Sequence, residues 1–172
     1  MKQTRLILVG GFLGAGKTTL LWETAVRLMN KGLRVGLITN DQAPELVDSE
    51  LLKLSDLRVA EVSGSCFCCN FNGFTDAIKE IRAEASADVI IAEPVGSCTD
   101  LSATIMQPLK QYWNTELKIS PLTVLADPNR LVSILNGGNG GLHPDAAYIY
   151  KKQLEESDII LLSKSDVLKR EE

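Results

Sequence analysis

Short apolar runs alternate along this chain with longer stretches in which apolar residues recur every three or four positions. Short apolar runs bounded by polar or glycine positions are typical of buried strands, and the periodic stretches are typical of amphipathic helices. The predicted strands are residues 6–9, 35–39, 59–62, 89–92, 119–126 and 159–162. The predicted helices are residues 18–30, 45–54, 74–85, 99–113, 128–135 and 144–156.

Three prolines refine this assignment. Pro108 should kink or split the helix over 99–113, because proline lacks a backbone N–H. Pro121 indicates that the strand over 119–126 either lies at a sheet edge or begins late. Asp127 is placed to cap the helix that Pro128 opens. Because strands alternate with helices throughout, the sequence predicts an α/β fold with a mostly parallel sheet and helices on both faces.

Polar motifs follow nearly every predicted strand, which is where open parallel sheets bind their ligands. Because the carboxyl ends of parallel strands meet at one edge of the sheet, we expect these motifs to converge there. They are residues 10–18, Asn40-Asp41, the cysteine-containing loop 63–70, Glu93, Asp127 and Ser163–Asp166.

Residues 11–18 satisfy the phosphate-loop pattern G-x-x-x-x-G-K-[ST] without a substitution. A predicted strand precedes them and a predicted helix follows, which is the context that the motif requires. Backbone N–H groups of such a loop point at phosphate oxygens, Lys17 would reach the β- and γ-phosphates, and the Thr18 hydroxyl would ligate Mg²⁺. The expected nucleotide-binding residues here are Gly11, Gly14, Ala15, Gly16, Lys17, Thr18 and Thr19.

Two acidic residues at strand ends are candidates for catalysis. Asp41 could hold Mg²⁺ through a water or orient the hydrolytic water, although an Asn-Asp pair also forms ordinary turns. Glu93 is placed to bind Mg²⁺ through its water shell. Gly96, three residues later, can bring a backbone N–H near the γ-phosphate. We therefore expect Lys17, Asp41 and Glu93 to carry catalysis, and Thr18 and Glu93 to serve Mg²⁺.

Residues 163–166, Ser-Lys-Ser-Asp, resemble the guanine-reading motif N-K-x-D. The Asp166 carboxylate can accept hydrogen bonds from N1–H and N2–H₂ of guanine, a donor pair that adenine does not offer. The aliphatic stem of Lys164 can cover the base. Ser163 stands where asparagine is usual, so one contact to the base is weakened or lost.

Three of the four cysteines, Cys66, Cys68 and Cys69, fall within four consecutive residues. This spacing does not suit a disulfide framework, and in a reducing compartment it favours a metal site. Thiolates accept Zn²⁺, Cu(I) and iron–sulfur clusters, so they do not select the metal alone. Buried structural thiols and a redox pair are the alternatives. Cys98 is either a fourth ligand or a small core residue.

Composition is ordinary for one soluble domain: 172 residues, 45% hydrophobic and 23% charged, with a net charge of −4. The chain has no basic block, so neither nucleic acid nor an anionic membrane is expected as a partner. No apolar run approaches the roughly 20 residues that span a bilayer. Because glycines interrupt the apolar run at its start, we do not expect residues 1–16 to act as a signal peptide. We expect a cytoplasmic protein.

Taken together, the motifs resemble the CobW-like family of GTPases, which is related to the nickel-insertion GTPases of urease and hydrogenase. The matching pieces occur in family order over nearly the whole chain. They are Gly10–Leu20, Thr39-Asn40-Asp41, the C-x-C-C loop Cys66–Cys69, Glu93 with Gly96, and Ser163–Asp166.

The resemblance implies a SIMIBI-like P-loop GTPase domain over residues 1–172, without the C-terminal domain with which family members continue. It implies GTP and GDP as ligands, Mg²⁺, and delivery of Zn²⁺, Co²⁺ or Ni²⁺ to a client protein; some family members are linked to cobalamin. Assembly as a homodimer stays open. The alternative is a nucleotide-binding metal or redox sensor with little turnover. An adenine-nucleotide kinase is disfavoured by Asp166.

Overall fold

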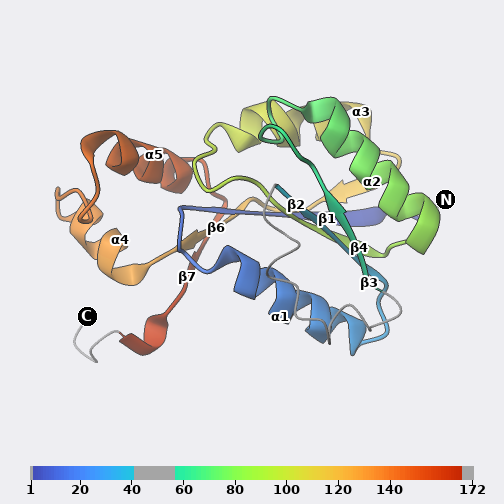
Figure 1. The fold of residues 1–172 in the computed structure, drawn as a ribbon, viewed down its shortest axis with the longest axis horizontal. Coiled ribbons are helices and arrows are strands. Elements are labelled where there is room, and N and C mark those ends of the chain that lie inside the picture. The colour runs from blue at the N-terminus through green and yellow to red at the C-terminus, as the bar shows by residue number, and fades with distance from the viewer. Residues whose placement is uncertain (1, 41–56, 168–172) are drawn as a thin grey trace.

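Seven strands pair in parallel into one sheet in the computed structural model, which describes residues 2–40 and 57–167 (Figure 1). Their order across the sheet is β3-β2-β4-β1-β6-β7, and β5 also pairs with β1. The strands are β1 (Thr4–Gly11), β2 (Val35–Thr39), β3 (Leu57–Glu61), β4 (Val89–Glu93), β5 (Leu117–Ile119), β6 (Thr123–Ala126) and β7 (Ile159–Leu162).

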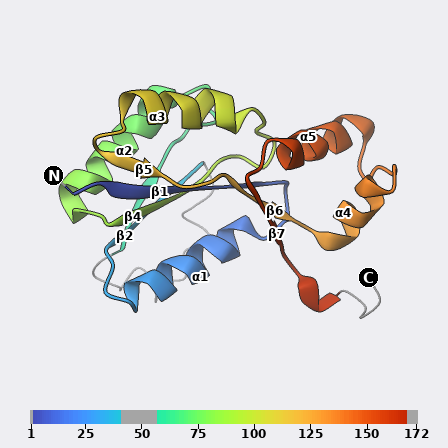
Figure 2. The same cartoon turned by 180° about the vertical axis from the view of Figure 1, so that it is seen from behind.

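Helices flank this sheet on both sides, as the alternation of strands and helices predicts (Figures 1 and 2). Helix α1 lies on one side and α2 and α3 lie on the other. The helices are α1 (Lys17–Met29), α2 (Phe71–Ala85), α3 (Gln107–Tyr112), α4 (Pro128–Leu135) and α5 (Pro144–Glu155), with a π-helical turn η2 (Ser102–Met106) and a 3₁₀ turn η3 (Ser165–Val167).

Alternate side chains of the central strands pack into two separate apolar cores, because successive residues of a strand point to opposite faces of the sheet. Leu6 and Leu8 of β1 join the cluster beneath α2 and α3, whereas Val9 joins the cluster beneath α1. Ile90 and Ile91 of β4 divide in the same way. The sheet is therefore buried on both faces at its centre, which explains why these strands read as continuous apolar runs.

The region around Pro121 departs from the simplest prediction. The strand predicted over 119–126 is two short strands, β5 and β6, separated by residues 120–122. β5 pairs with the first half of β1 and β6 with the second half. The prediction that the strand begins late is confirmed, and the edge alternative is wrong, because β6 lies between β1 and β7. Pro121 is tolerated because it lies outside the ladder.

The helix predicted over 99–113 changes its winding next to Pro108. The wide turn η2 ends at Met106, α3 begins at Gln107, and the Gln107 N–H donates to the carbonyl of Ser102 five residues earlier. Proline cannot donate to the turn before it. The predicted interruption thus takes the form of a π-helical turn just ahead of the proline.

The other element predictions differ from the structure mainly at their ends. α2 begins three residues earlier than predicted, where the Asn70 side chain accepts a hydrogen bond from the Gly73 N–H at 3.0 Å. Asp127 caps α4 as predicted, accepting from the N–H groups of Asn129 and Arg130. The helix predicted over 45–54 and the candidate Asp41 lie outside the described residues.

β7 differs from the central strands in its surroundings. All four of its residues are exposed, although all four are leucine or isoleucine. Within the described part of the chain, burial on both faces therefore holds for the centre of the sheet and not for β7.

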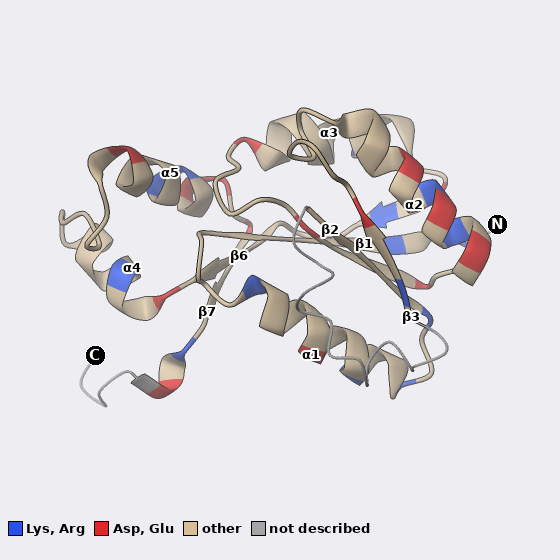
Figure 3. Ribbon diagram, in the orientation of Figure 1, with Lys and Arg blue, Asp and Glu red and all other residues tan. Residues whose placement is uncertain are grey.

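Charged residues of both signs are spread over the elements and alternate along α2 (Figure 3). Among the described residues, no helix combines the length and the apolar character needed to cross a bilayer.

Candidate nucleotide and thiol site

The phosphate loop connects the end of β1 to the start of α1, as predicted. Gly11, Gly14 and Gly16 have φ angles of 135°, 74° and 94°, which side chains other than glycine rarely allow. A Cβ on Gly11 would also lie 2.6 Å from the carbonyl oxygen of Leu125 in β6. The loop is closed by a hydrogen bond of 3.1 Å from the Ala15 N–H to the Phe12 carbonyl. These glycines curl the backbone at the N-terminus of α1, where an anion is favoured.

Lys17, Thr18 and Glu93 meet at this loop, although 75 residues separate Thr18 from Glu93. The Thr18 hydroxyl donates to the Glu93 carboxylate, 3.2 and 3.3 Å from its two oxygens. The Lys17 ammonium lies 3.8 Å from the same carboxylate and is 6% exposed. Burial lowers the pKa of Lys17, opposed by the Glu93 charge. Burial raises the pKa of Glu93, opposed by Lys17 and by the Thr18 hydroxyl. The three groups predicted to serve phosphate and Mg²⁺ are thus adjacent.

Gly96 packs directly against the phosphate loop. A Cβ added there would lie 3.0 Å from the Leu13 N–H nitrogen and 3.1 Å from the Lys17 ammonium. Only a residue without a side chain lets the backbone approach this closely. The structure therefore brings Gly96 next to Lys17, and its place beside the γ-phosphate stays a prediction.

A cavity of about 400 Å³ opens on the other side of the phosphate loop. Ala15, Gly16 and Thr19 line it from the loop and α1, and Ser163 and Lys164 line it after β7. The Lys164 ammonium donates to the Gly14 carbonyl at 2.9 Å and pairs with Asp127 at 3.3 Å. This arrangement brings the motif after β7 to the phosphate loop. Asp166, in η3, is exposed.

The sulfur atoms of Cys66, Cys68 and Cys69 lie within 4.8 Å of one another. Those of Cys66 and Cys68 are 2.9 Å apart. Burial raises the pKa of the Cys66 thiol, but hydrogen bonds from Cys68 and Cys69 lower it to about 7. Burial and the neighbouring Cys66 raise the pKa of Cys68 to about 11. Three ligand atoms in one tight loop form a tripod that suits a thiophilic cation.

Cys98 lies beside this cluster. It is buried in the same apolar core as Phe67, and Cys66 and Cys68 pack against that core. Burial, followed by the thiols of Cys66 and Cys68, raises the pKa of Cys98 to about 12. The two alternatives for Cys98, a fourth ligand and a core residue, are therefore both compatible with its position.

Two side chains hold this edge of the sheet together: Asn40, which belongs to a predicted strand-end motif, and Gln153, which the sequence did not single out. The Asn40 amide donates to the carbonyls of Val62 and Ser65 at 2.7 Å each, fastening the cysteine loop to the end of β2. The Gln153 amide, from α5, donates to the carbonyls of Gly96 and Cys98. A signal for Gln153 was present: it occupies a buried position of α5 in the stripe of Ala147 and Tyr150.

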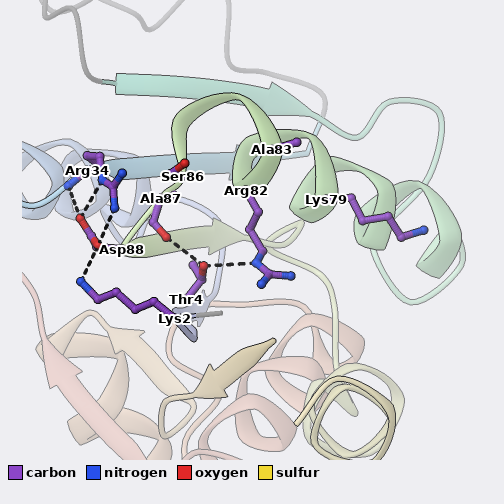
Figure 4. Close-up of a pocket in the computed structure, with 9 residues that line it drawn as sticks. All are labelled: Lys2, Thr4, Arg34, Lys79, Arg82, Ala83, Ser86, Ala87 and Asp88. Carbon is purple, nitrogen blue, oxygen red and sulfur yellow. Dashed lines mark hydrogen bonds and ion pairs between the residues drawn. The ribbon is translucent and has the colours of Figure 1, made fainter. Parts of the chain in front are cut away.

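Another cavity, of about 550 Å³, lies at the opposite edge, where β1 and β4 begin (Figure 4). Its dominant feature is Asp88, which accepts from Lys2 at 2.8 Å and from Arg34 at 3.0–3.1 Å. The Arg34 guanidinium, then Lys2, hold the pKa of Asp88 well below its usual range. Because ligands of parallel sheets bind at the carboxyl ends, we assign this cluster to stability rather than to chemistry.

A family model described as "CobW/HypB/UreG, nucleotide-binding domain" matches residues 5–172. The chain belongs to this family. It covers roughly half or less of each curated relative named here. The zinc chaperone YeiR of Escherichia coli K12 is 25% identical over 167 residues, which cover 95% of this chain and 47% of that protein. The zinc chaperone CobW of Sinorhizobium sp. is 28% identical over 187 residues, covering 93% and 50%. The zinc-regulated GTPase metalloprotein activator 1 of Dictyostelium discoideum is 24% identical over 196 residues, covering 95% and 40%.

Solved structures agree with the CobW/HypB/UreG assignment at the level of the fold. Zn(II)-bound YjiA GTPase from E. coli superposes with a TM-score of 0.64 at 20% identity, covering 97% of this chain and 51% of that one. Hydrogenase maturation factor HypB from Archaeoglobus fulgidus gives 0.60 at 14% identity, covering 96% and 68%. The predicted P-loop fold and family resemblance are thereby confirmed.

Proposed function

We propose that this chain is the nucleotide-binding domain of a GTP-hydrolysing metallochaperone that carries a thiophilic divalent cation on Cys66, Cys68 and Cys69. One observation supports this most strongly. The three-thiol cluster and the phosphate loop lie at the same edge of the sheet, and one short segment, residues 93–98, reaches both. The curated relatives named as zinc chaperones favour Zn²⁺ over Co²⁺ and Ni²⁺ as the cargo.

The proposed reaction is hydrolysis of GTP to GDP and phosphate. Water forms a bond to the γ-phosphorus while the bond from that phosphorus to the β–γ bridging oxygen breaks. Lys17 and the loop N–H groups stabilise the charge on the transferring group, which is how phosphoryl transfer is generally catalysed. Thr18 and Glu93 would hold Mg²⁺, whose charge would further neutralise the phosphates; their adjacent oxygens suit such a hard cation. Positioning of water by Asp41 or Glu93 stays a prediction.

Preference for guanine is the second part of the proposal. Lys164 lines the cavity beside the phosphate loop, and Asp166 follows two residues later. We propose that Lys164 covers the base and that Asp166 accepts from its N1–H and N2–H₂ groups. The remaining parts of the proposal are a metal-requiring client protein as recipient and a cytoplasmic location. Dimerisation stays open.

A sensor with little turnover is the second candidate function. The 2.9 Å approach of the Cys66 and Cys68 sulfurs favours it, because such a pair also suits reversible oxidation. Turnover distinguishes the two functions, since a sensor requires ligand binding alone.

The test combines phosphate release with metal titration. We expect steady-state GTP hydrolysis by the parent protein, and its loss in Lys17→Ala with the melting temperature retained. The matched control, Lys110→Ala, removes an exposed lysine from α3 and should hydrolyse like the parent. A chelator-competition titration should show one Zn²⁺ per chain, lost in the Cys66/Cys68/Cys69 triple serine variant. Parent-like hydrolysis by folded Lys17→Ala, or parent-like zinc affinity in the triple variant, would refute the corresponding half of the proposal.

A further inference from the structure

We infer that Gln153 is a positioning residue: its side-chain amide holds residues 96–98 against α5 and thereby transmits nucleotide state to the thiol cluster. The inference rests on the proposed function, because it needs both a nucleotide and a metal ligand. It adds a residue, a route and a measurable consequence that the proposed function does not contain.

The amide of Gln153 makes both of its donor contacts to one short segment. Nε2 lies 3.0 Å from the carbonyl oxygen of Gly96 and 2.9 Å from that of Cys98. A primary amide has two N–H groups, so it can donate one to each of these two carbonyls of the same turn. The turn has one internal bond of its own, from the Cys98 N–H to the Val95 carbonyl at 3.0 Å. The side chain therefore ties two points of the turn to α5.

One of these two points lies at the phosphate loop. A Cβ on Gly96 would come within 3.0–3.2 Å of Leu13 backbone atoms and of the Lys17 ammonium. Gly96 is therefore packed against the loop with no free room for even one methyl group, and interiors this dense resist small independent displacements. A change in the position of Lys17 on gain or loss of the terminal phosphate would therefore be felt at Gly96.

The other point lies at the thiol cluster. The Cys98 side chain is buried in the core against which Cys66 and Cys68 pack. Only Ser97 separates Gly96 from Cys98, so a shift at the first carbonyl reaches the second unless the turn deforms. Gln153 opposes that deformation because it holds both carbonyls at once.

Gln153 is buried and has an unusual hydrogen-bonding environment. The residue is 2% exposed, and its Oε1 has no hydrogen-bond partner among the described residues. A buried acceptor without a partner is costly, so part of what the two donor contacts of Gln153 contribute to stability is offset. α5 itself is well anchored. Its residues Ala147 and Tyr150 lie in a buried apolar cluster, and the carboxylate of Glu156, at the C-terminal end of the helix, accepts a hydrogen bond from the Ser102 N–H at 3.3 Å. The helix is a firm support for the turn.

The experiment measures coupling between the two ligands. Zn²⁺ affinity is titrated with GDP and with a non-hydrolysable GTP analogue bound, and the ratio of the two dissociation constants is the coupling factor. We expect a factor of about 5 to 150 in the parent. In Gln153→Met, which keeps the shape and removes both donors, we expect it to fall to within about twofold of unity. Zinc affinity without nucleotide should change far less.

The matched control is Gln107→Met, the same chemical change at an exposed helical position, which should keep the parent's factor. A merely structural role would lower stability in both nucleotide states alike and leave the ratio intact. A folded Gln153→Met variant with the parent's coupling factor would overturn the inference. A parent that binds both ligands without coupling would overturn it too, while leaving the proposed binding functions in place. A parent that binds neither zinc nor guanine nucleotide would instead refute the proposed function.

A second measurement does not depend on how the variant folds. Amide hydrogen exchange of the parent is compared with GDP and with the GTP analogue bound. We expect the protection of backbone amides from hydrogen exchange to differ between the two nucleotide states. The difference should appear at residues 96–98 and around Gln153 together. A change at residues 96–98 with none in α5 would show that Gln153 does not link the two, and would overturn the inference.

Discussion

Replacing Gly96 by alanine tests how closely residues 93–98 are fitted to the phosphate loop. The added Cβ would lie 3.0 Å from the Leu13 nitrogen, 3.2 Å from its Cα and 3.1 Å from the Lys17 ammonium. Ordinary van der Waals contacts of a Cβ are about 3.4 Å or longer, so the neighbours must yield by a few tenths of an ångström. Lys17 can rotate away, but the Leu13 backbone belongs to a loop whose shape the Ala15–Phe12 hydrogen bond closes.

Overpacking of this kind costs about 1–3 kcal/mol. The displaced groups are those that we expect at the terminal phosphate, and misplacement by 1 Å costs about 100-fold in rate. We therefore expect Gly96→Ala to hydrolyse GTP about 10- to 100-fold more slowly. Phosphate release and thermal unfolding are measured together, with Gly10→Ala as the control. A Cβ on Gly10 meets Val124 at an ordinary 3.4 Å, so that variant should retain activity. Parent-like turnover by Gly96→Ala would show that the turn is not fitted to the loop as described.

Two further predictions concern separate parts of the molecule. Asp166→Asn should weaken GTP binding by about 1.5–3 kcal/mol and shift preference towards xanthine nucleotides, because a charge-assisted pair of hydrogen bonds is lost. Competition binding of GTP, XTP and ATP measures this preference. Equal affinity of the parent protein for GTP and ATP would contradict the proposed role of Asp166. Asp88→Asn should lower the free energy of unfolding at pH 7 by about 1–2 kcal/mol, against about 0.5 or less for the exposed Asp76→Asn. Because the folded-state pKa of Asp88 is depressed, its contribution is fully present above the unfolded pKa of about 3.9, shrinks below that value, and is lost only as pH falls through the much lower folded-state pKa. Denaturant melts between about pH 3 and pH 7 measure it, and a difference as large at pH 3 as at pH 7 would contradict the assignment.

The sequence by itself determined the fold class, because that information is local. Apolar runs such as residues 35–39 and 89–92 are buried on both faces and could be recognised without their partners. The same holds for the phosphate loop, whose glycine positions reflect backbone angles that other residues resist. The capping of α4 by Asp127 is equally local. Each of these features is determined by residues that lie close to one another in the sequence.

The convergence of the site residues could be predicted in part. All polar motifs were expected at one edge of the sheet, since parallel strands end together. The structure brings Thr18 to Glu93 and Lys164 to Gly14, in agreement with that expectation. The roles of these residues stay predictions, and Asp41 lies outside the described residues.

Only the tertiary structure decided which groups hold the two halves of the site together. Asn40 is read from sequence as a turn residue, yet its amide fastens the cysteine loop. Gln153 is an ordinary helical residue in the sequence, yet it reaches two carbonyls 55 and 57 positions away. Likewise, Pro121 predicted an edge strand or a late start, but not that β1 would pair with two short strands on either side of the proline. The physical reason is common to all three: strand order and helix docking create these contacts, whereas periodicity and composition report only on neighbours along the chain.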